Sequence, residues 1–340
     1  MRATQADPAL GILKSRWFRL LVSVGLLAAV IQLADWRAIS DVLRRAEPRW
    51  VAVALACAVL DRVLLNYRWQ VLLAARRLAM RFLPLLRIQL AANFLGSFLP
   101  SSIGVDAIRI ASLCRAGWPA SDVIAATLVD RATIALASLL FGAAMILTLA
   151  GTRLPDELQS WVLGITVAAC FACIVALQPG VRAWVRRHLL ARLPERVRGL
   201  STDVISAMLA FRHQSLALSQ VAFLTAIIFT VRILFAKALA LACGAPVSFV
   251  DLLLIVPILW IIVMVPITIG GIGLQDAGYV ALMALVGVPP AIAVSMSLIE
   301  HVVARLVALP GAFFLADVTG TVTATTTARA PVIPAAQNKE

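Results

Sequence analysis

Long apolar stretches alternate along this chain with short polar segments that are rich in arginine. Three stretches carry no charged residue over their whole length, at 160–181, 252–275 and 277–299. A helix that crosses a bilayer needs about 20 consecutive, mostly apolar residues. Each of these stretches is therefore long enough to cross a membrane, and the pattern predicts an all-α polytopic membrane protein.

Eight membrane segments are predicted, of which six are continuous and two are broken. The six full spans are expected at 20–34, 50–70, 122–150, 161–178, 217–243 and 290–316. Pro and Gly interrupt the other two segments, 88–116 and 249–287. A proline removes a helix hydrogen bond, and such a loss is tolerated at membrane depth only where the backbone lines a protected or wet cavity. We expect two re-entrant hairpins; two short spans in place of each hairpin are the alternative.

The two broken segments belong to a repeat with an offset of 170 residues. Five positions match at that offset: Asp106 with Asp276, Gly117 with Gly287, Pro119 with Pro289, Asp130 with Glu300, and Arg131 with His301. Upstream, Pro100 and Gly104 have a looser counterpart in the stretch from Pro266 to Gly273. The repeat halves are placed at 88–150 and 249–316. Repeats with interrupted hydrophobic segments in matching places indicate a substrate site in membrane transporters.

The composition supports a membrane protein and excludes a nucleic-acid partner. The chain has 62% hydrophobic and 14% charged residues, whereas a soluble domain has about 25% charged residues. The net charge of +13 lies mostly in short loops beside the spans, which is the positive-inside pattern. The predicted inner loops (1–19, 71–87 and 179–216) hold 15 basic residues, and the predicted outer loops (35–49, 150–160 and 244–248) hold 5.

This bias predicts a bacterial-type inner (plasma) membrane protein with both termini in the cytoplasm. It also makes the helix of Asp130 run outward and the helix of Glu300 run inward, so the two repeats are predicted to be inverted. The expected organisation is a cytoplasmic N-terminus at 1–19, a single transmembrane domain at 20–316, and a disordered tail at 317–340.

Ionisable residues inside the spans need a partner or a wet cavity, because each costs about 2.5–3.5 kcal/mol at the bilayer centre. Asp106 and Arg109 lie three residues apart on one helical face and can pair directly. Asp130 and Arg131 are adjacent and point in different directions. We expect them to face Glu300, His301 and Arg305 across the repeat interface, so that the acids and bases neutralise each other. Simple inter-helix salt bridges without a binding role are the alternative.

Other charged positions are expected to be structural. Arg232 in the fifth span is predicted to be buried, and Lys237 to extend toward the membrane surface. Asp61 and Arg62 are placed near a membrane interface and are not counted in a site. The glycine-rich stretch from Pro266 to Gly273 lacks the Lys-Ser/Thr ending of a nucleotide P-loop. It is either a backbone cradle for a lipid phosphate or a place of close helix packing.

No Ser-His-Asp set and no zinc-ligand spacing is visible in the sequence, so we predict no catalytic residues, no metal and no cofactor. Cys170 and Cys173 are interpreted as small buried residues, because no histidine or second cysteine pair accompanies them. The expected role is therefore binding or transport of a membrane component and not enzymatic catalysis.

A combination of motifs resembles a known family. It consists of Asn93-x(6)-Pro100-x(3)-Gly104-x-Asp106-x(2)-Arg109, then Asp130-Arg131, then Pro266-x(3)-Gly270-Gly271-x-Gly273-x(2)-Asp276. This is similar to the transmembrane domain of lysylphosphatidylglycerol synthases, which also occurs alone in the UPF0104 (YbhN-like) membrane proteins. The resemblance covers about residues 15–317 and implies a flippase-like domain, which in the synthases moves aminoacylated phosphatidylglycerol between leaflets.

Two departures limit what the resemblance implies. The family's second motif usually carries a Glu after Gly-x-Gly-x-Arg, where this chain has Gln275-Asp276. Only a short tail follows Ala316, where the synthases carry a soluble aminoacyl-transferase domain. The resemblance therefore implies lipid translocation and gives no support for lysyl transfer.

The sequence predicts a protein that binds and translocates a phospholipid or a lipid-linked headgroup between leaflets. An integral-membrane transferase, or an accessory subunit of one, acting on lipid-linked sugar or isoprenoid lipid, is the alternative. The expected partner is a membrane lipid with an anionic or glycosylated headgroup, and a membrane-bound enzyme or a second copy of the chain is a further candidate. The candidate substrate-binding residues are Asn93, Pro100, Gly104, Asp106, Arg109, Asp130, Arg131, Gly270, Gly271, Gly273, Asp276, Glu300, His301 and Arg305.

Overall fold

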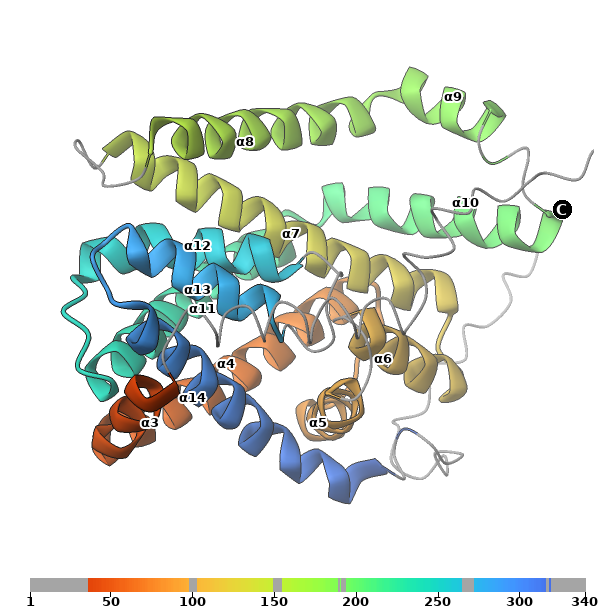
Figure 1. Cartoon of the computed structure of the whole chain (residues 1–340). Helices are drawn as coiled ribbons and strands as arrows, with labels where there is room; N and C mark the ends of the chain where they lie inside the picture. The colour runs from red at the N-terminus through yellow and green to blue at the C-terminus, as the bar shows by residue number, and fades with distance from the viewer. Residues whose placement is uncertain are drawn as a thin grey trace, which may run out of the picture.

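The computed structural model describes residues 36–97, 103–148, 155–188, 190, 194–264, 272–315 and 318. Within these ranges every regular element is a helix, and no strand occurs (Figure 1). The predicted first span at 20–34 lies outside the described residues, and so do Pro100, Gly270 and Gly271. The all-α polytopic fold predicted from the sequence is confirmed.

Five helices in the described part of the chain are long and apolar enough to cross a membrane. They are α4 (Pro48–Ala75), α7 (Ala120–Thr148), α8 (Asp156–Leu177), α11 (Ser215–Ala242) and α14 (Pro290–Ala308), which continues into the 3₁₀ helix η3 (Leu309–Phe314). At a rise of 1.5 Å per residue, the 28 residues of α4 span about 42 Å, which exceeds the roughly 30 Å of bilayer hydrocarbon. These helices match the second to the sixth predicted full spans.

Both predicted broken segments consist of two shorter helices. The first contains α5 (Phe82–Gly96) and α6 (Ile103–Arg115), and the second contains α12 (Phe249–Met264) and α13 (Leu274–Ala284). In each segment the two helices pack against each other. The contacts are close: a methyl group added at Gly96 would come within 2.3 Å of Val105 Cγ2, and one added at Gly278 within 2.9 Å of Leu259 Cδ1.

The two broken segments enter the bundle from opposite ends. Arg76, which follows α4, forms an ion pair of 2.6 Å with Asp122 in the first turn of α7, so α5 and α6 begin and end at one end of the bundle. At the start of α4, the Glu47 N–H donates to the Ala242 carbonyl at 3.1 Å, and α3 (Trp36–Arg45) packs against α14. The segment of α12 and α13 therefore begins and ends at the opposite end, as an inverted repeat requires.

The corners that follow the two broken segments have the same backbone conformation. Gly117 has φ 89° and Gly287 has φ 79°, a region that residues with a side chain rarely occupy. The next N–H bonds back to the preceding helix in both copies, from Trp118 to the Leu113 carbonyl at 3.1 Å and from Val288 to the Met283 carbonyl at 3.0 Å. These corners turn the chain into α7 and α14, and their match supports the duplication.

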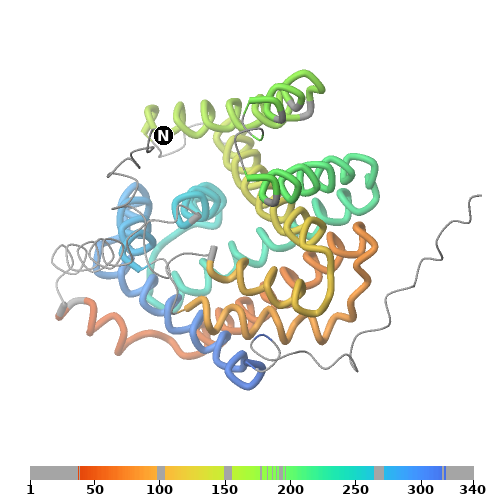
Figure 2. The backbone as a smooth tube through the Cα atoms, turned by 90° about the vertical axis from the view of Figure 1, so that its right-hand side faces the viewer, coloured from red at the N-terminus to blue at the C-terminus, as the bar shows by residue number. Residues whose placement is uncertain are grey.

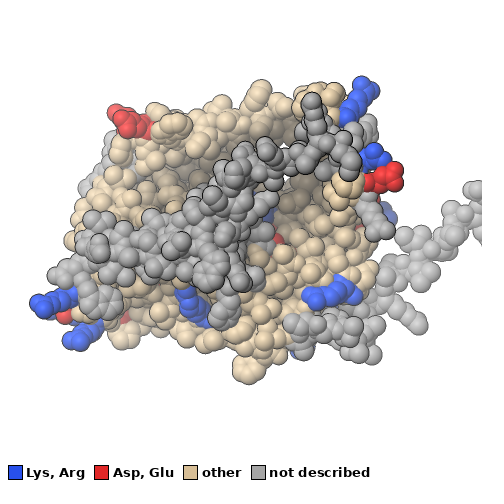
Figure 3. Space-filling model, turned by 45° about the vertical axis from the view of Figure 1, so that its right-hand side comes forward, with Lys and Arg blue, Asp and Glu red and all other residues tan. Residues whose placement is uncertain are grey.

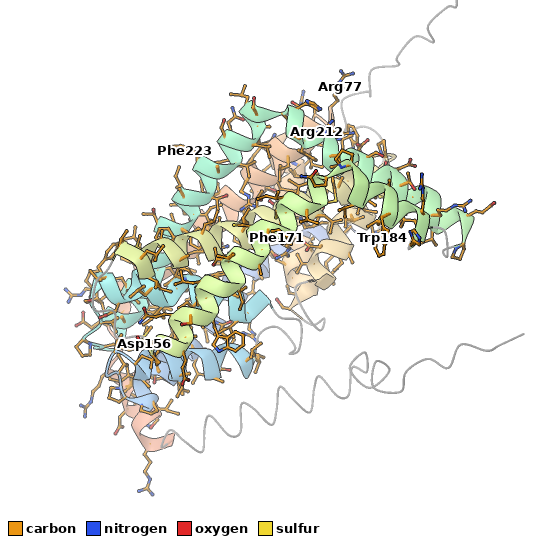
Figure 4. The ribbon with its side chains drawn as sticks, turned by 90° about the horizontal axis from the view of Figure 1, so that it is seen from above. Arg77, Asp156, Phe171, Trp184, Arg212 and Phe223 are labelled. Carbon is orange, nitrogen blue, oxygen red and sulfur yellow. The ribbon has the colours of Figure 1, made fainter. Side chains whose placement is uncertain are left out.

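Charged and apolar side chains separate along the bundle. Figure 4 places Asp156 at one end and Arg77, Trp184 and Arg212 toward the other, where α9 (Pro179–His188) and α10 (Glu195–Ala210) also lie. Where described residues are visible in Figure 3, most charged side chains lie toward the edges of the face. Helix α8 lies at the edge of the bundle against α7 (Figures 1 and 2) and exposes Phe171 and other apolar side chains. This distribution fits a chain whose apolar belt contacts lipid.

Candidate functional site

An antiparallel pair of helices, α4 and α11, forms the centre of the bundle and carries two buried polar contacts. Arg232 Nε donates to Asp61 Oδ1 at 2.8 Å, and Arg68 donates to Thr225 Oγ1 at 3.3 Å. Along α4 the two contacts lie seven residues apart, which is about 10 Å. Asp61 precedes Thr225 by 164 residues, and Arg68 precedes Arg232 by the same number. The two contacts are therefore equivalent under an exchange of α4 with α11.

Around Arg68 the first half of the chain gathers a cationic cluster, defined here as Arg68, Asp106, Arg109, Asp130 and Arg131. Arg68 donates to Asp130 Oδ1 at 2.8 Å and to the Asp130 carbonyl at 2.5 Å, and its side chain is fully buried. Breaking a buried pair of this kind by removing one partner is costly, because the remaining charge has no compensation.

The second acid of the cationic cluster accepts from two arginines. Asp106 lies in the first turn of α6, directly after the break, and bonds Arg109 at 3.2 Å and Arg131 at 2.6 Å. Arg109 also stacks on Trp69 at 3.7 Å from the ring centroid. Three guanidinium groups thus face two carboxylates, and the cluster carries an excess positive charge. Arg131 is the accessible member, with 35% of its side chain exposed.

In the second half, an acidic cluster contains Asp61, Arg232, Asp276, Tyr279, Glu300 and His301. Besides its bond to Asp61, Arg232 stacks on Trp260 at 3.5 Å from the ring centroid. The Tyr279 hydroxyl donates to Glu300 Oε2. Three carboxylates therefore share one guanidinium and one imidazole, which is the reverse of the charge balance in the cationic cluster.

Asp276 has a structural role at the start of α13. Its Oδ2 accepts from the N–H of Gly273 at 2.8 Å, and its Oδ1 accepts from Ser297 Oγ at 2.5 Å and lies 3.2 Å from His301 Nε2. The residue is fully buried. A carboxylate in the first turn stabilises the helix by bonding a free backbone N–H and by opposing the positive end of the helix dipole.

The contacts in the two clusters correspond at the repeat offset of 170 residues. The pair Asp106–Arg131 has its counterpart in Asp276–His301. Arg109 acts electrostatically on Asp130 in one half, and its positional equivalent, Tyr279, bonds Glu300 in the other. The repeat therefore preserves which positions meet while it changes the side chains that meet there.

The prediction that the two halves neutralise each other across the interface is wrong. Among the described residues, no ion pair joins Asp130 or Arg131 to Glu300, His301 or Arg305. Asp130 and Arg131 find their partners within the first half, because Arg68 and Asp106 lie closer. Arg305 is exposed, and its guanidinium donates to the His301 carbonyl of its own helix at 2.8 Å.

Several residues of the two clusters were misplaced or missed in the sequence. Asp61 was expected near a membrane interface, yet it is buried with Arg232. The predicted site residues also did not include four residues that contact the clusters: Arg68, Trp69, Trp260 and Tyr279. A signal for Arg68 was present, because an arginine two turns after Asp61 inside an apolar span needs a buried partner.

Two predicted residues, Asn93 and Gly104, lie on either side of the first break. Asn93 lies in the last turns of α5, where its Oδ1 accepts from Gln89 at 3.3 Å. Its buried Nδ2 has no acceptor among the described residues, and neither has Nε of Arg109. Gly104 lies in the first turn of α6, and it is partly buried.

A cavity of about 80 Å³ opens beside the acidic cluster. Helices α4, α11, α12, α13 and α14 contribute to its wall, which combines apolar residues with Asp61, Arg62, Arg232, Trp260, Tyr279 and Glu300. Glu300 lies ten residues after the start of α14, about 15 Å along the helix. Arg131 lies eleven residues into α7, about 16 Å along it. Both clusters are thus near the middle of the span.

Comparison with known proteins identifies relatives of the whole described bundle. The profile of the family described as "Lysylphosphatidylglycerol synthase TM region" matches residues 16–311. A protein described as "UPF0104 membrane protein" from Methanothermobacter thermautotrophicus is 24% identical over 314 residues, which cover 84% of this chain and 89% of that protein.

Proposed function

The chain belongs to the lysylphosphatidylglycerol synthase TM-region family, and we propose that it binds a phospholipid or lipid-linked headgroup and moves it between leaflets. The cationic cluster is the observation that carries this proposal. Its excess positive charge is centred on a partly exposed Arg131 near mid-span. A guanidinium in that position can bind a phosphate oxygen through charge-assisted hydrogen bonds.

The broken helices supply further donors for an anionic headgroup. Each of α6 and α13 begins directly after a break, and a helix start presents free N–H groups and a partial positive charge. In the second copy Asp276 already opposes that charge, whereas in the first copy Asp106 is shared by two arginines. The headgroup phosphate is therefore expected on the side of the first broken segment.

The two broken segments enter the bundle from opposite ends, and this supports movement of a lipid in addition to its binding. Inverted hairpins that meet near the bilayer midplane are the arrangement in which one repeat can rock against the other and expose a site alternately to the two sides. The segments α5–α6 and α12–α13 enter the bundle from opposite ends, which supports this mode of movement.

Reconstitution in proteoliposomes tests the proposal with tail-labelled phosphatidylglycerol as the anionic lipid. Arg131→Ala should slow its movement at least about tenfold, because a hydrogen bond to a charged group contributes about 1.5–3 kcal/mol. Arg187→Ala is the matched control, since Arg187 is an exposed arginine on α9, outside both clusters. Wild-type protein that leaves phosphatidylglycerol in one leaflet would contradict the proposed function. Equal rates for wild type and Arg131→Ala would exclude the cationic cluster as the site.

We also propose that the end with α9, α10 and Arg77 faces the cytoplasm, because most of the basic loops gather there. Single cysteines introduced into a cysteine-free variant test this orientation in intact cells. Pro155→Cys, before α8, should react with an impermeant maleimide, and Glu195→Cys, at the start of α10, should react only after lysis. Labelling of position 195 from outside would reverse the orientation.

A further inference from the structure

Asp130 and Glu300 occupy equivalent positions in the two halves, but their partners differ. Asp130 has a buried arginine at 2.8 Å. Glu300 accepts from the Tyr279 hydroxyl, and no arginine or lysine lies within ion-pair distance of it among the described residues. Two differences between the halves explain why Glu300 has no arginine partner in the described part of the chain. Tyr279 stands where the first half has Arg109, and Arg232, the counterpart of Arg68, bonds Asp61 instead.

Glu300 lies on the wall of the cavity, which several other ionisable residues also line. Arg232 on α11, Tyr279 on α13, and three residues of α4 share that wall, while His301 follows on its own helix; the α4 residues are Cys57, Asp61 and Arg62. Helix α12 contributes the uncharged Trp260. Glu300 is half-buried and lines the cavity itself.

An unpaired Glu300 carboxylate would be destabilising near the middle of the membrane, because a charged side chain at the bilayer centre costs about 2.5–3.5 kcal/mol even on insertion scales. A proton can replace the missing cation. The Tyr279 hydroxyl suits both states, since a phenol donates to a carboxylate and accepts from a carboxylic acid. Arg232 remains charged in both states, because a guanidinium is not deprotonated in proteins.

The two halves display two arrangements of one set of contacts. In the first half, Arg68 bonds the acid on α7 tightly and the α11 hydroxyl of Thr225 weakly, at 3.3 Å. In the second half, Arg232 bonds the α4 acid at 2.8 Å and leaves the acid on α14 to a tyrosine. A shift of Arg232 from Asp61 toward Glu300 would convert the second arrangement into the first.

From this difference we infer that Glu300 is a proton-binding site whose protonation is coupled to the lipid movement proposed above, on which the coupling rests. With the proton bound, Glu300 is neutral and Arg232 stays on Asp61. When the O–H bond breaks, the proton passes to water in the cavity, and the Glu300 carboxylate attracts Arg232. The partner exchange moves α11 relative to α4 and α14, and these helices connect the two halves.

Infrared spectroscopy of the full-length protein in lipid tests the proton site without any transport measurement. The wild type should show the C=O stretch of a protonated carboxyl near neutral pH, and this band should disappear as the pH rises. Glu300→Gln, which is isosteric with the protonated form, should lack the band. Glu195→Gln is the control, because Glu195 is exposed at the start of α10. A band that persists in Glu300→Gln, or a wild type without any band, would overturn the inference.

Proteoliposomes with an imposed pH gradient test the coupling, with tail-labelled phosphatidylglycerol as the probe. The wild-type rate should change when the gradient is reversed, Glu300→Asp should keep this response, and Glu300→Gln should lose it while remaining monodisperse. A wild type that moves lipid at one rate under both gradients contradicts coupling and leaves the proposed function intact. A wild type that moves no lipid refutes the proposed function, and the infrared band then still decides whether Glu300 binds a proton.

Discussion

The first and second halves of this bundle have the same framework but opposite charge balances. In the cationic cluster, three arginines surround two aspartates, and the acid on α7 is locked by Arg68 at 2.8 Å. In the acidic cluster, three carboxylates share Arg232 and His301, and the acid on α14 accepts from the Tyr279 hydroxyl without an ion pair to any described arginine or lysine. The two halves thus share the positions of contact, but the acid on α7 pairs with an arginine and the acid on α14 bonds a tyrosine.

The largest loss of stability is expected at the buried pair of Arg68 and Asp130. Asp130→Asn should lower the free energy of unfolding by about 3–5 kcal/mol, because it leaves the fully buried Arg68 without its anion. Glu300→Gln should cost much less, since no arginine depends on Glu300. Thermal unfolding of both variants in the same detergent measures the difference.

The control for this prediction replaces both charges. In Arg68→Leu/Asp130→Leu no buried charge is left alone, so the double variant should recover much of the stability that Asp130→Asn loses. Equal melting temperatures for Asp130→Asn and Glu300→Gln would contradict the distinction between an acid that pairs with a buried arginine and an acid that bonds a tyrosine.

A moderate and equal loss of stability is expected at the two glycine corners, where the halves are alike. Gly117→Ala and Gly287→Ala should each destabilise the protein by about 1–2 kcal/mol, because an alanine is strained at positive φ. A Cβ at either glycine meets no atom within 4 Å, so packing should add nothing to either cost. Urea unfolding of the two variants should show similar losses, and a loss at one corner alone would weaken the case for equivalence.

The smallest loss of stability is expected at the long hydrogen bond between Arg68 and Thr225. Thr225→Val removes a hydroxyl that accepts from Arg68 at 3.3 Å, and it should cost about 1 kcal/mol or less, because Arg68 keeps Asp130. Asp61→Asn, at the equivalent position of α4, should cost more, since the bond to Arg232 loses its full negative charge. Melting temperatures measured side by side decide the order, and a larger loss for Thr225→Val would contradict it.

Features that depend on local sequence were predictable. Five of the six expected full spans appear as long helices, and both interrupted segments appear as pairs of short helices. The pairing of Asp106 with Arg109 also follows from spacing along one helix. These predictions succeed because apolar length, Pro and Gly breaks and i,i+3 geometry act within a single segment.

Partners from distant segments could not be assigned in the same way. Asp130 had several candidate cations, and its actual partner, Arg68, depends on how α4 packs beside α7. Likewise, the burial of Asp61 depends on its facing α11, which begins more than 150 residues later in the chain. Charges at symmetric positions of a repeat do not have to face each other, so the prediction that Asp130 and Arg131 pair with the second half was wrong. They instead lie in separate clusters along the α4–α11 pair.

The exchange of polar residues between α4 and α11 has a consequence for biosynthesis. When the first half enters the membrane from the ribosome, Arg68 can already pair with Asp130 of its own half, and Thr225 adds little later. Asp61, by contrast, must wait for Arg232, which arrives only when α11 is inserted. The acid that Arg232 requires is then already in the bilayer, so the nascent first half serves as the template on which the second half is assembled.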